Sequence, residues 1–500
     1  MTDLLNNLIL GFSVALTPMN LLYCLIGVSL GTLIGVLPGI GPIGTIAMLL
    51  PATFKLSPVS ALIMLAGIYY GAQYGGSTTA ILVNIPGESS SVVTCLDGYQ
   101  MARQGRAGPA LAIAALGSFF AGCVGTLLIV LFGPPLAELA LKFGSPEYFS
   151  LMVLGLVSAA VLAHGSLLKA IAMVLLGLLL GLVGLDVYSG MARFTFGISA
   201  LNDGIGFVVV AMGLFGYAEI ISSLEQKENR EVFTSQVRRL MPTWADLKAS
   251  WGAVLRGTAV GSLLGLVPGS GPIICSFASY TVEKRLAKDP SRFGKGAIEG
   301  VAGPESANNA AAQTTFIPML TLGIPGTATM ALMLGALMIH GIPPGPQVMT
   351  QHPELFWGLI ASMWIGNLML VLLNLPLIGI WVRLLMVPYR WLYPAILLFS
   401  CVGIYSLSNS PFDVILSALF GLLGYLFVKV GCEPAPFLLA FILGPLMEQN
   451  LRRALLLSRG DPTIFFTRPV SLAFMLAAAL MLVVLVAPIV RRKRERAFQE

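Results

Sequence analysis

The sequence predicts an all-α polytopic membrane protein, on the evidence of its composition, its charge-free tracts and its interrupted apolar segments. Of 500 residues, 56% are hydrophobic and only 10% are charged, and the mean hydropathy is +0.87. A soluble domain carries about 25% charged residues, because its surface must be wetted. Most of the outer surface of this chain must therefore face lipid, and an ordinary soluble enzyme is excluded.

Long tracts without Asp, Glu, Lys or Arg mark the expected membrane spans. A helix needs about 20 apolar residues to cross a hydrocarbon core about 30 Å thick. Tracts of this length are Ala107–Ala137, Phe149–Leu168, Gly257–Val282, Leu355–Val382, Trp391–Phe412 and Pro469–Val490. Two shorter tracts, Ala170–Leu185 and Val414–Val428, are expected to span with help from flanking residues. The sequence thus predicts roughly 10 to 12 transmembrane segments.

Two basic segments set the expected orientation. Residues 225–256 and 283–299 are rich in Lys and Arg, and the positive-inside rule places such segments in the cytoplasm. The tract between them must then enter and leave the membrane on one side. Its centre, Pro268–Pro272, leaves arms of about 10 or 11 residues, about 16 Å each, which are too short to cross. We expect a re-entrant or half-length pair, with a full span starting near Ala249 as the alternative.

The net charge of +6 does not indicate a nucleic-acid partner, because surplus Lys and Arg are usual in cytoplasmic loops of membrane proteins. The basic cluster at residues 491–496 is expected in the cytoplasm. Four arginines between residues 452 and 468, before the last span, favour the cytoplasm almost equally. Because the two clusters flank the same span, the side of the membrane on which the C-terminus lies stays open.

Two motifs recur in the same order and indicate an internal repeat. Gly31–Ile43 matches Gly261–Ile273 at eight of thirteen positions, 230 residues apart, and Asn84–Gly87 matches Gly323–Gly326, 239 residues apart. Many secondary transporters consist of repeated halves, often of inverted topology, and we expect the same here. The predicted units are residues 1–224 and 250–465 as the two membrane repeats, 225–256 as a basic cytoplasmic linker, and 466–500 as a final transmembrane helix with a basic tail.

Proline and glycine interrupt each half at its first motif. Two prolines that bracket two glycines forbid a continuous helix, and the freed backbone groups survive only inside protein or beside a wet cavity. Such discontinuous helices form the binding sites of repeat-built transporters. The expected backbone contacts or hinges are Pro38, Gly39, Gly41, Pro42, Pro268, Gly269, Ser270, Gly271 and Pro272. The G-x-x-x-G spacing at Gly27, Gly31, Gly35, Gly261 and Gly265 has a simpler explanation in close helix packing.

Hydroxyl and amide side chains accompany the later breaks. A helix that begins inside the bilayer offers free N–H groups and the positive end of its dipole to an anion. The expected substrate-binding residues are Ser89, Ser90, Ser91, Asn308, Asn309, Thr327, Thr329, Gly87 and Gly326. No Lys or Arg occurs in these motifs, so binding should be moderate and release easy. The alternative is that the Ser and Asn side chains cap buried helix ends.

Two acids stand in the same segments. Acids at membrane depth are costly and often functional, as proton or cation sites. Glu88 and Glu305, together with Asn84, are therefore the candidates for cation coupling. Asp97 and Arg103 look like parts of a structural loop at the membrane interface.

The remaining residues indicate neither a metal centre nor an enzyme. The six Cys form no C-x-x-C pair, and the three His lack metal-ligand spacing. His340, inside an apolar tract, is an alternative proton relay. Walker and H-E-x-x-H motifs do not occur in the sequence. We expect no catalytic residue and no cofactor.

Several of these motifs resemble those of a known family, the large membrane subunit of the tripartite tricarboxylate transporters. The motifs are Gly35–Pro42, Tyr74–Ser77, Asn84–Gly87, Leu96–Gly108, Pro304–Ala310 and Leu322–Gly326. The resemblance implies a multi-pass permease of the bacterial inner membrane. It also implies a periplasmic solute-binding protein and a small membrane subunit of about four helices as partners.

The resemblance further implies that the chain imports small carboxylates, of the tricarboxylate or dicarboxylate class, by symport with a cation, either a sodium ion or a proton. The residues alone predict only a repeat-built secondary transporter with a site that suits an anion. The alternatives are a passive anion channel, a transporter for another small solute without a binding protein, and a membrane-embedded enzyme.

Overall fold

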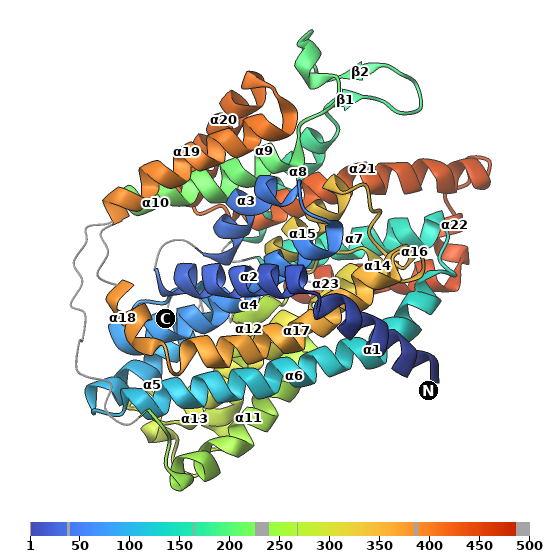
Figure 1. Cartoon of the computed structure of the whole chain (residues 1–500). Coiled ribbons are helices and arrows are strands. Elements are labelled where there is room, and N and C mark those ends of the chain that lie inside the picture. Colours follow the sequence, from blue (N-terminus) through green and yellow to red (C-terminus); the bar gives the residue numbers. More distant parts are fainter. Residues whose placement is uncertain are drawn as a thin grey trace.

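The chain folds into a bundle of α-helices (Figure 1). A computed structural model describes residues 2–37, 41–163, 166–225, 240–267, 269–384 and 389–486. Within these ranges nearly every element is a helix, and the one strand pair joins β1 (Gly184–Leu185) to β2 (Ala192–Arg193) in antiparallel register. The predicted all-α polytopic class is confirmed.

The elements before the central linker run from blue to green in Figure 1. They are α1 (Thr2–Ala15), α2 (Pro18–Val36), α3 (Pro42–Thr53), α4 (Pro58–Val83), η1 (Ser89–Ser91), α5 (Val92–Arg103), α6 (Ala107–Ala140), α7 (Ser145–Leu162), α8 (Leu167–Gly181), β1, β2, η2 (Ser199–Leu201), α9 (Phe207–Ala211), the π-helical η3 (Met212–Tyr217) and α10 (Ala218–Glu225).

The elements after the linker run from yellow-green to red. They are α11 (Trp244–Gly265), α12 (Gly271–Leu286), η4 (Pro290–Arg292), α13 (Glu299–Thr314), α14 (Phe316–Leu322), α15 (Ala328–Ile339), α16 (Gln347–Gln351), α17 (Pro353–Asn374), α18 (Ile378–Leu384), α19 (Tyr389–Ser408), α20 (Pro411–Lys429), α21 (Pro434–Leu457), α22 (Ile464–Thr467) and α23 (Pro469–Val486).

Four helices in the described part of the chain are long and apolar enough to cross a membrane by themselves. These are α2, α6, α17 and α20. Other apolar helices, among them α3, α8 and α15, have between 10 and 17 residues. The prediction of roughly 10 to 12 crossings therefore stays a prediction.

Both predicted Pro-Gly breaks interrupt a helix. α2 ends at Val36 and α3 begins at Pro42, whereas α11 ends at Gly265 and α12 begins at Gly271, with Pro272 next. Proline at the first positions of a helix is favoured, because those N–H groups have no partner within the helix. The sequence prediction of two interruptions is confirmed.

The predicted arms of about 10 or 11 residues around the second break are wrong. α11 begins at Trp244, inside the predicted linker, where the Thr243 side chain caps the helix by accepting from the Asp246 N–H. The helix has 22 residues, or about 33 Å, which is enough to cross. The prediction counted only charge-free residues, but Lys248 and Arg256 are part of this helix. The two alternatives, a re-entrant pair and a full span, both stay predictions.

Two seams of backbone contact hold the bundle together. Where α2 crosses α4, a Cβ on Gly31 would lie 2.4 Å from the carbonyl oxygen of Ile68. Where α11 crosses α13, a Cβ on Gly261 would lie 2.1 Å from that of Ala307. Neighbouring contacts repeat the pattern: Gly27 with Met64, Gly35 with Ala72, Gly257 with Gly303 and Gly265 with Ala311. Gly31 and Gly261 are 230 residues apart and their partners Ile68 and Ala307 are 239 residues apart, which are the same separations as those of the two repeated sequence motifs. Close helix packing therefore explains the G-x-x-x-G glycines.

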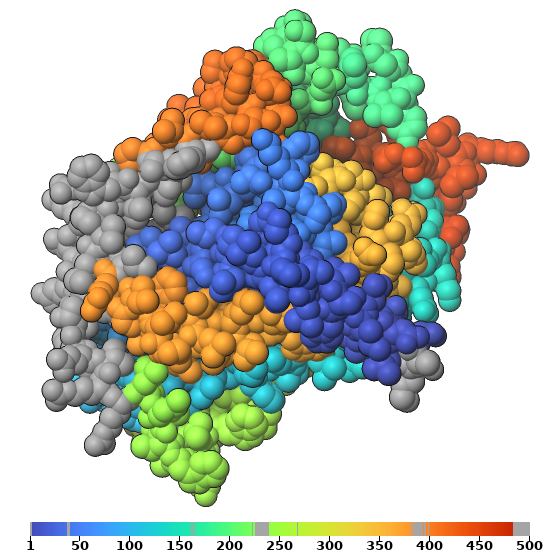
Figure 2. Space-filling model, in the orientation of Figure 1, coloured from blue at the N-terminus to red at the C-terminus, as the bar shows by residue number. Residues whose placement is uncertain are grey.

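The long helices of the two predicted halves are interleaved. α6 packs against α11 and α13, whereas α17 packs against α2 and α4. Figure 2 shows α17 beside α2 on one face of the molecule. Each helix pair that forms a seam is therefore covered by a helix from the other half, and residues of both halves meet in the interior.

Candidate functional site

The later breaks of the two halves have the same backbone conformation. Each begins with a left-handed residue, Asn84 at φ 57° and Gly323 at φ 72°. Each ends with an extended residue at φ −144°, which is Glu88 in the first break and Thr327 in the second. Asparagine is one of the few residues besides glycine that adopts the left-handed region readily. Each break therefore ends one helix and begins the next.

Within each half, the later break lies against the Pro-Gly break. A Cβ on Gly87 would lie 1.9 Å from the carbonyl oxygen of Gly35, one residue before α2 ends. In the other half, the N–H of Gly269 donates to the carbonyl oxygen of Gly326 at 2.7 Å. Gly87 and Gly326 therefore serve backbone contact between the breaks in this structure.

The breaks also meet across the halves. α3, which follows the first Pro-Gly break, packs against α15, which follows the later break of the second half. α12, which follows the second Pro-Gly break, packs against η1 and α5. Interrupted helices of both halves thus converge in the described part of the chain.

A polar cluster joins the halves at η1, and we call it the Glu88 cluster: Gln73, Glu88, Ser90 and Asn308. Ser90 Oγ donates to Asn308 Oδ1 at 2.9 Å and also to the Glu88 carboxylate. Asn308 Nδ2 donates to Glu88 Oε1 at 3.2 Å. With its nitrogen turned toward acceptors, the Gln73 amide donates to Glu88 Oε1 and Asn308 Oδ1, both at 2.5 Å.

A second set, the Glu305 cluster, also includes residues of α13 and contains Ser77, Thr94, Ser118, Glu305 and Asn309. Ser77 Oγ donates to Glu305 Oε2 at 2.5 Å, and Thr94 donates to the other carboxylate oxygen. Asn309 Nδ2 donates to Ser118 Oγ at 2.7 Å and to the backbone oxygen of Glu305 at 3.1 Å. The cluster ties α13 to α4, α5 and α6.

The two acids are buried without a positive partner. Glu88 is 8% exposed and Glu305 is 1% exposed. The ion pairs found among the described residues include neither of them. Their partners are neutral hydroxyl and amide groups, which can hold a carboxyl in either charge state. Burial of an acid without a counter-charge costs free energy and usually has a functional reason.

Glu305, Asn308 and Asn309 do not lie in a break, which corrects the sequence prediction. They belong to the continuous helix α13, and Pro304 lies inside that helix. A proline this close to a helix start removes only one intrahelical hydrogen bond, so the helix continues through it. Gly303 is used in packing, because a Cβ there would approach Ser279 to 3.0 Å.

The other predicted donors do not join the two clusters. Ser89 is exposed, and Ser91 Oγ donates to the Glu88 backbone oxygen at 2.8 Å. Thr327 accepts from the Met330 N–H at 3.2 Å and so caps α15. Thr329 is buried, but no hydrogen bond in the described residues links it or Thr327 to either cluster. For Ser91 and Thr327, the helix-capping alternative describes the contacts.

The predicted hinge and coupling positions are placed in part. Pro38, Gly39 and Pro268 lie outside the described residues. Gly41 precedes α3 and Pro42 begins it. The exposed Asn84 makes its turn without joining the Glu88 cluster. The positions around the second break have these roles: Gly269 donates to Gly326, Ser270 Oγ donates to Val267 O at 2.7 Å, Gly271 has φ +51° and Pro272 stands at the start of α12.

Comparison with known proteins identifies the family. Residues 21–439 match the tripartite tricarboxylate transporter TctA family. The chain belongs to this family. It is a transporter subunit of a tripartite system, and the resemblance deduced from the motifs is confirmed. No solved structure matches the chain.

Two relatives of this TctA-family chain come from Agrobacterium vitis. The chain is 60% identical over 500 residues, the full length of both proteins, to an uncharacterized 52.8 kDa protein in the TAR-I ttuC′ 3′ region. It is 58% identical over 240 residues to an uncharacterized protein in the TAR-II ttuC′ 3′ region, which covers 48% of this chain and 99% of the relative.

Four residues of the clusters in this TctA-family chain were not predicted: Gln73, Ser77, Thr94 and Ser118. The spacing of polar residues in the sequence could have indicated three of them, Gln73, Ser77 and Thr94. Gln73 and Ser77 are four residues apart in α4, and Ser90 and Thr94 are four apart across η1 and α5, so each pair lies on one helix face. Ser118 sits in an apolar stretch of α6 and gives no such signal.

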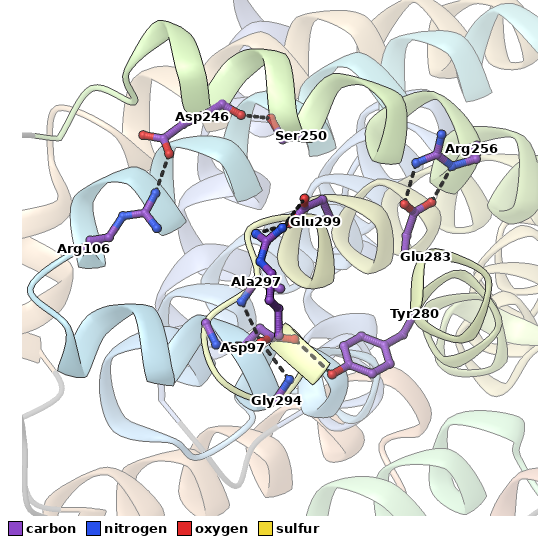
Figure 3. Close-up of polar contacts among 12 residues, drawn as sticks. Asp97, Arg106, Asp246, Ser250, Arg256, Tyr280, Glu283, Gly294, Ala297 and Glu299 are labelled. Carbon is purple, nitrogen blue, oxygen red and sulfur yellow. Dashed lines mark hydrogen bonds and ion pairs between the residues drawn. The ribbon is translucent and has the colours of Figure 1, made fainter. Parts of the chain in front are cut away.

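A third buried acid fixes the position of the clusters (Figure 3). Asp97 is fully buried in α5. Its Oδ1 accepts from the N–H groups of Gly294, Gly296 and Ala297 at 2.9, 2.8 and 2.8 Å. Its Oδ2 accepts from Tyr280 Oη at 3.0 Å. The expected structural loop is thus a helix, and Asp97 attaches it to the start of α13 and to α12.

Proposed function

We propose that this chain is the large permease subunit of a binding-protein-dependent secondary transporter that imports small carboxylates by cation symport. The proposal includes an inner-membrane location, two inverted halves, a periplasmic solute-binding protein and a small membrane subunit of about four helices, by analogy with the family. The observation that carries it is the burial of Glu88 and Glu305 in the region where interrupted helices of both halves converge. Neither acid forms an ion pair with a described Lys or Arg side chain.

The anion preference is supported by the donors around η1. A helix that starts inside the molecule presents N–H groups and a positive dipole end. Ser90 and Asn308, from different halves, supply neutral donors at the same place. A carboxylate could replace the Glu88 side chain as their hydrogen-bond partner when the helices move apart. Domain movement of this kind would release Glu88 from Asn308.

The symport component follows from charge. Two like charges about 4 Å apart repel by about 4 kcal/mol at an effective dielectric constant of 20. A carboxylate substrate beside ionised Glu88 or Glu305 would meet this repulsion, since no described Lys or Arg pairs with either acid. A proton or sodium ion bound near these acids would remove it. Cation and anion would then each raise the affinity for the other, which is the thermodynamic condition for coupling.

Uptake into proteoliposomes tests the proposal. The chain is reconstituted with its candidate small partner, with and without binding protein, and with an imposed sodium or proton gradient. We expect saturable uptake that needs the gradient. Saturable uptake that needs neither gradient would refute symport, and non-saturating passive flux would favour the alternative of an anion channel.

Charge-removing variants sharpen this test. Glu88→Gln and Glu305→Gln keep size and hydrogen-bonding capacity but lose the ionisable group. Each should lower gradient-driven accumulation by about 10-fold, because the coupling free energy is lost. Glu138→Gln is the matched control, since Glu138 is exposed on α6. Wild-type accumulation by both cluster variants would remove these acids from the coupling mechanism.

A further inference from the structure

A small cavity lies between α4, α6 and α17, beside the Glu305 cluster. Its polar lining consists of Tyr74, Ser77 and Thr78 from α4, Ser118 from α6 and Asn374 from α17. An apolar wall from α6, with Leu111, closes the other side. The space accepts about one water-sized particle. All five polar residues are at most 4% exposed, so an occupant would be surrounded by protein.

Two oxygens of this lining have no hydrogen-bond partner. The buried Tyr74 Oη is one, and the buried Asn374 Oδ1 is the other. The Asn374 nitrogen is already used, because it donates to the Leu370 backbone oxygen at 2.9 Å and to Thr32 Oγ1 at 3.5 Å. The free polar atom of this amide is therefore an acceptor. Buried polar atoms without partners are uncommon. Others occur among the described residues, Asn367 Oδ1 in the same helix included, but these two lie on the wall of one cavity.

The cavity is one hydrogen bond away from the proposed coupling acid. Ser77, in its lining, donates its proton to Glu305 and keeps oxygen lone pairs for another ligand. Ser118 accepts from Asn309 and likewise has a second lone pair. An occupant of the cavity would thus contact the hydroxyl groups that hold Glu305 and Asn309 in place.

The chemistry of the lining favours a cation over an anion. It offers hydroxyl and amide oxygens and contains no Lys, Arg or His. Hard cations take oxygen ligands, and transporters hold sodium with neutral oxygens beside interrupted helices. The Glu305 carboxyl adds nearby negative charge without being a wall of the cavity.

We propose that this cavity binds a single dehydrated sodium ion through Tyr74, Ser77, Thr78, Ser118 and Asn374. The inference rests on the proposed function and deepens it, because it gives the coupling ion a location. The ion would neutralise the charge of Glu305 through Ser77 and so favour an anion at the neighbouring Glu88 cluster. A cavity that holds only a water molecule is the competing outcome.

Ion binding by the purified protein tests the site without any transport. The thermal midpoint is measured in titrations of sodium, lithium, potassium and choline chloride at constant ionic strength. We expect sodium to raise the midpoint more than choline does, with saturation. Tyr74→Phe removes one oxygen, and Asn374→Leu removes one oxygen while keeping size. Each should raise the half-saturating sodium concentration about 10-fold, equivalent to about 1.4 kcal/mol.

Two matched controls separate ligand loss from general damage. Tyr148→Phe removes a phenol that donates to the Ala140 backbone oxygen on a different helix. Asn367→Leu lies two turns earlier in α17, where the amide makes the same type of backbone bond, to Met363 O at 2.8 Å, outside the cavity. Both should keep wild-type sodium half-saturation.

The outcomes distinguish this inference from the proposed function. Wild-type protein that responds equally to sodium and choline, or unchanged half-saturation in Tyr74→Phe and Asn374→Leu, would overturn the sodium site and leave water as the occupant. Gradient-driven uptake in the same preparations would still support symport. Conversely, a sodium-specific shift lost in Tyr74→Phe would support the site even if uptake proved independent of any gradient.

Discussion

Asp97 belongs to α5, yet it organises the loop that leads into α13. One of its oxygens receives three backbone N–H groups, from Gly294, Gly296 and Ala297. A carboxylate oxygen that accepts several N–H bonds is held in one rotamer. Because α5 also carries Thr94, which donates to Glu305, this contact sets the distance between the α5 face and the α13 face of the Glu305 cluster.

Replacement of this carboxylate should be costly. Asp97→Ala leaves three backbone donors without a partner, each worth about 1 to 3 kcal/mol when buried, so we expect a loss of about 3 kcal/mol or more. Tyr280→Phe removes one donor and leaves Asp97 with its other partners, and should cost about 1 kcal/mol. Thermal unfolding of the purified variants measures both. Equal midpoints for Asp97→Ala and Tyr280→Phe would show that the three N–H bonds contribute little.

The sequence predicted several side chains of the site but not their partners. Ser90 and Asn308 were expected as donors near an anion, and the structure brings them into contact. Their residue types and their neighbouring Gly and Pro residues made this prediction possible. Gln73 and Thr94 were missed, because their importance depends on how α4 and α5 are rotated against α13. That rotation is set by tertiary packing between distant segments, which a single sequence does not encode in any local pattern.

The helix pairs α2–α4 and α11–α13 are held close by glycine, and each pair carries part of the site. α4 contributes Gln73 and Ser77, and α13 contributes Glu305 and Asn308. The interruption of α2 and α11 was predictable, because two prolines around two glycines leave no continuous hydrogen-bond ladder. The continuity of α13 through Gly303 and Pro304 was not, since the same residue types also end helices and only the packing on α11 decides.

A single methyl group in a seam should disturb the site from a distance. Gly261→Ala would place its Cβ 2.1 Å from the Ala307 backbone oxygen, so α11 and α13 must separate. Overpacking of this kind typically costs about 1 to 3 kcal/mol. We expect a lower thermal midpoint and reduced uptake. Gly379→Ala is the control, because nothing lies within 4 Å of a Cβ there, and it should keep the wild-type midpoint. A wild-type midpoint for Gly261→Ala would mean that the seam yields easily.

The whole molecule has two distinguishable ends. At one end, Arg106 pairs with Asp246 at the start of α11, and Gln104 Nε2 donates to the Lys295 backbone oxygen at 2.8 Å. The basic residues of the α12–α13 connection gather there. At the other end, the β1–β2 hairpin is attached to α21 through Arg193–Glu448 at 2.8 Å and Arg452–Asp186 at 3.1 Å. Figure 1 shows the hairpin projecting from the body of the bundle.

The helical segment between these two ends predicts on which sides of the membrane they lie. The segment from α9 through η3 to α10 runs from the hairpin to the central linker, over residues 207–225, and is helical throughout. At 1.5 Å per residue it measures about 28 Å, close to the thickness of a hydrocarbon core. The hairpin and the linker should therefore lie on opposite sides of the membrane. We then expect the linker and the α12–α13 connection in the cytoplasm, as the positive-inside rule predicts.

Labelling of two engineered cysteines tests this orientation. Ser189, in the hairpin, and Ser291, in η4, are both exposed. A membrane-impermeant maleimide should label Ser189→Cys in intact cells and Ser291→Cys only after permeabilisation. The wild-type chain, whose cysteines are buried or half-buried, gives the background. The reverse pattern would invert the orientation, and labelling of both in intact cells would place the two ends on one side. Only labelling of both in intact cells would mean that residues 207–225 do not cross, whereas the reverse pattern would contradict the positive-inside assignment.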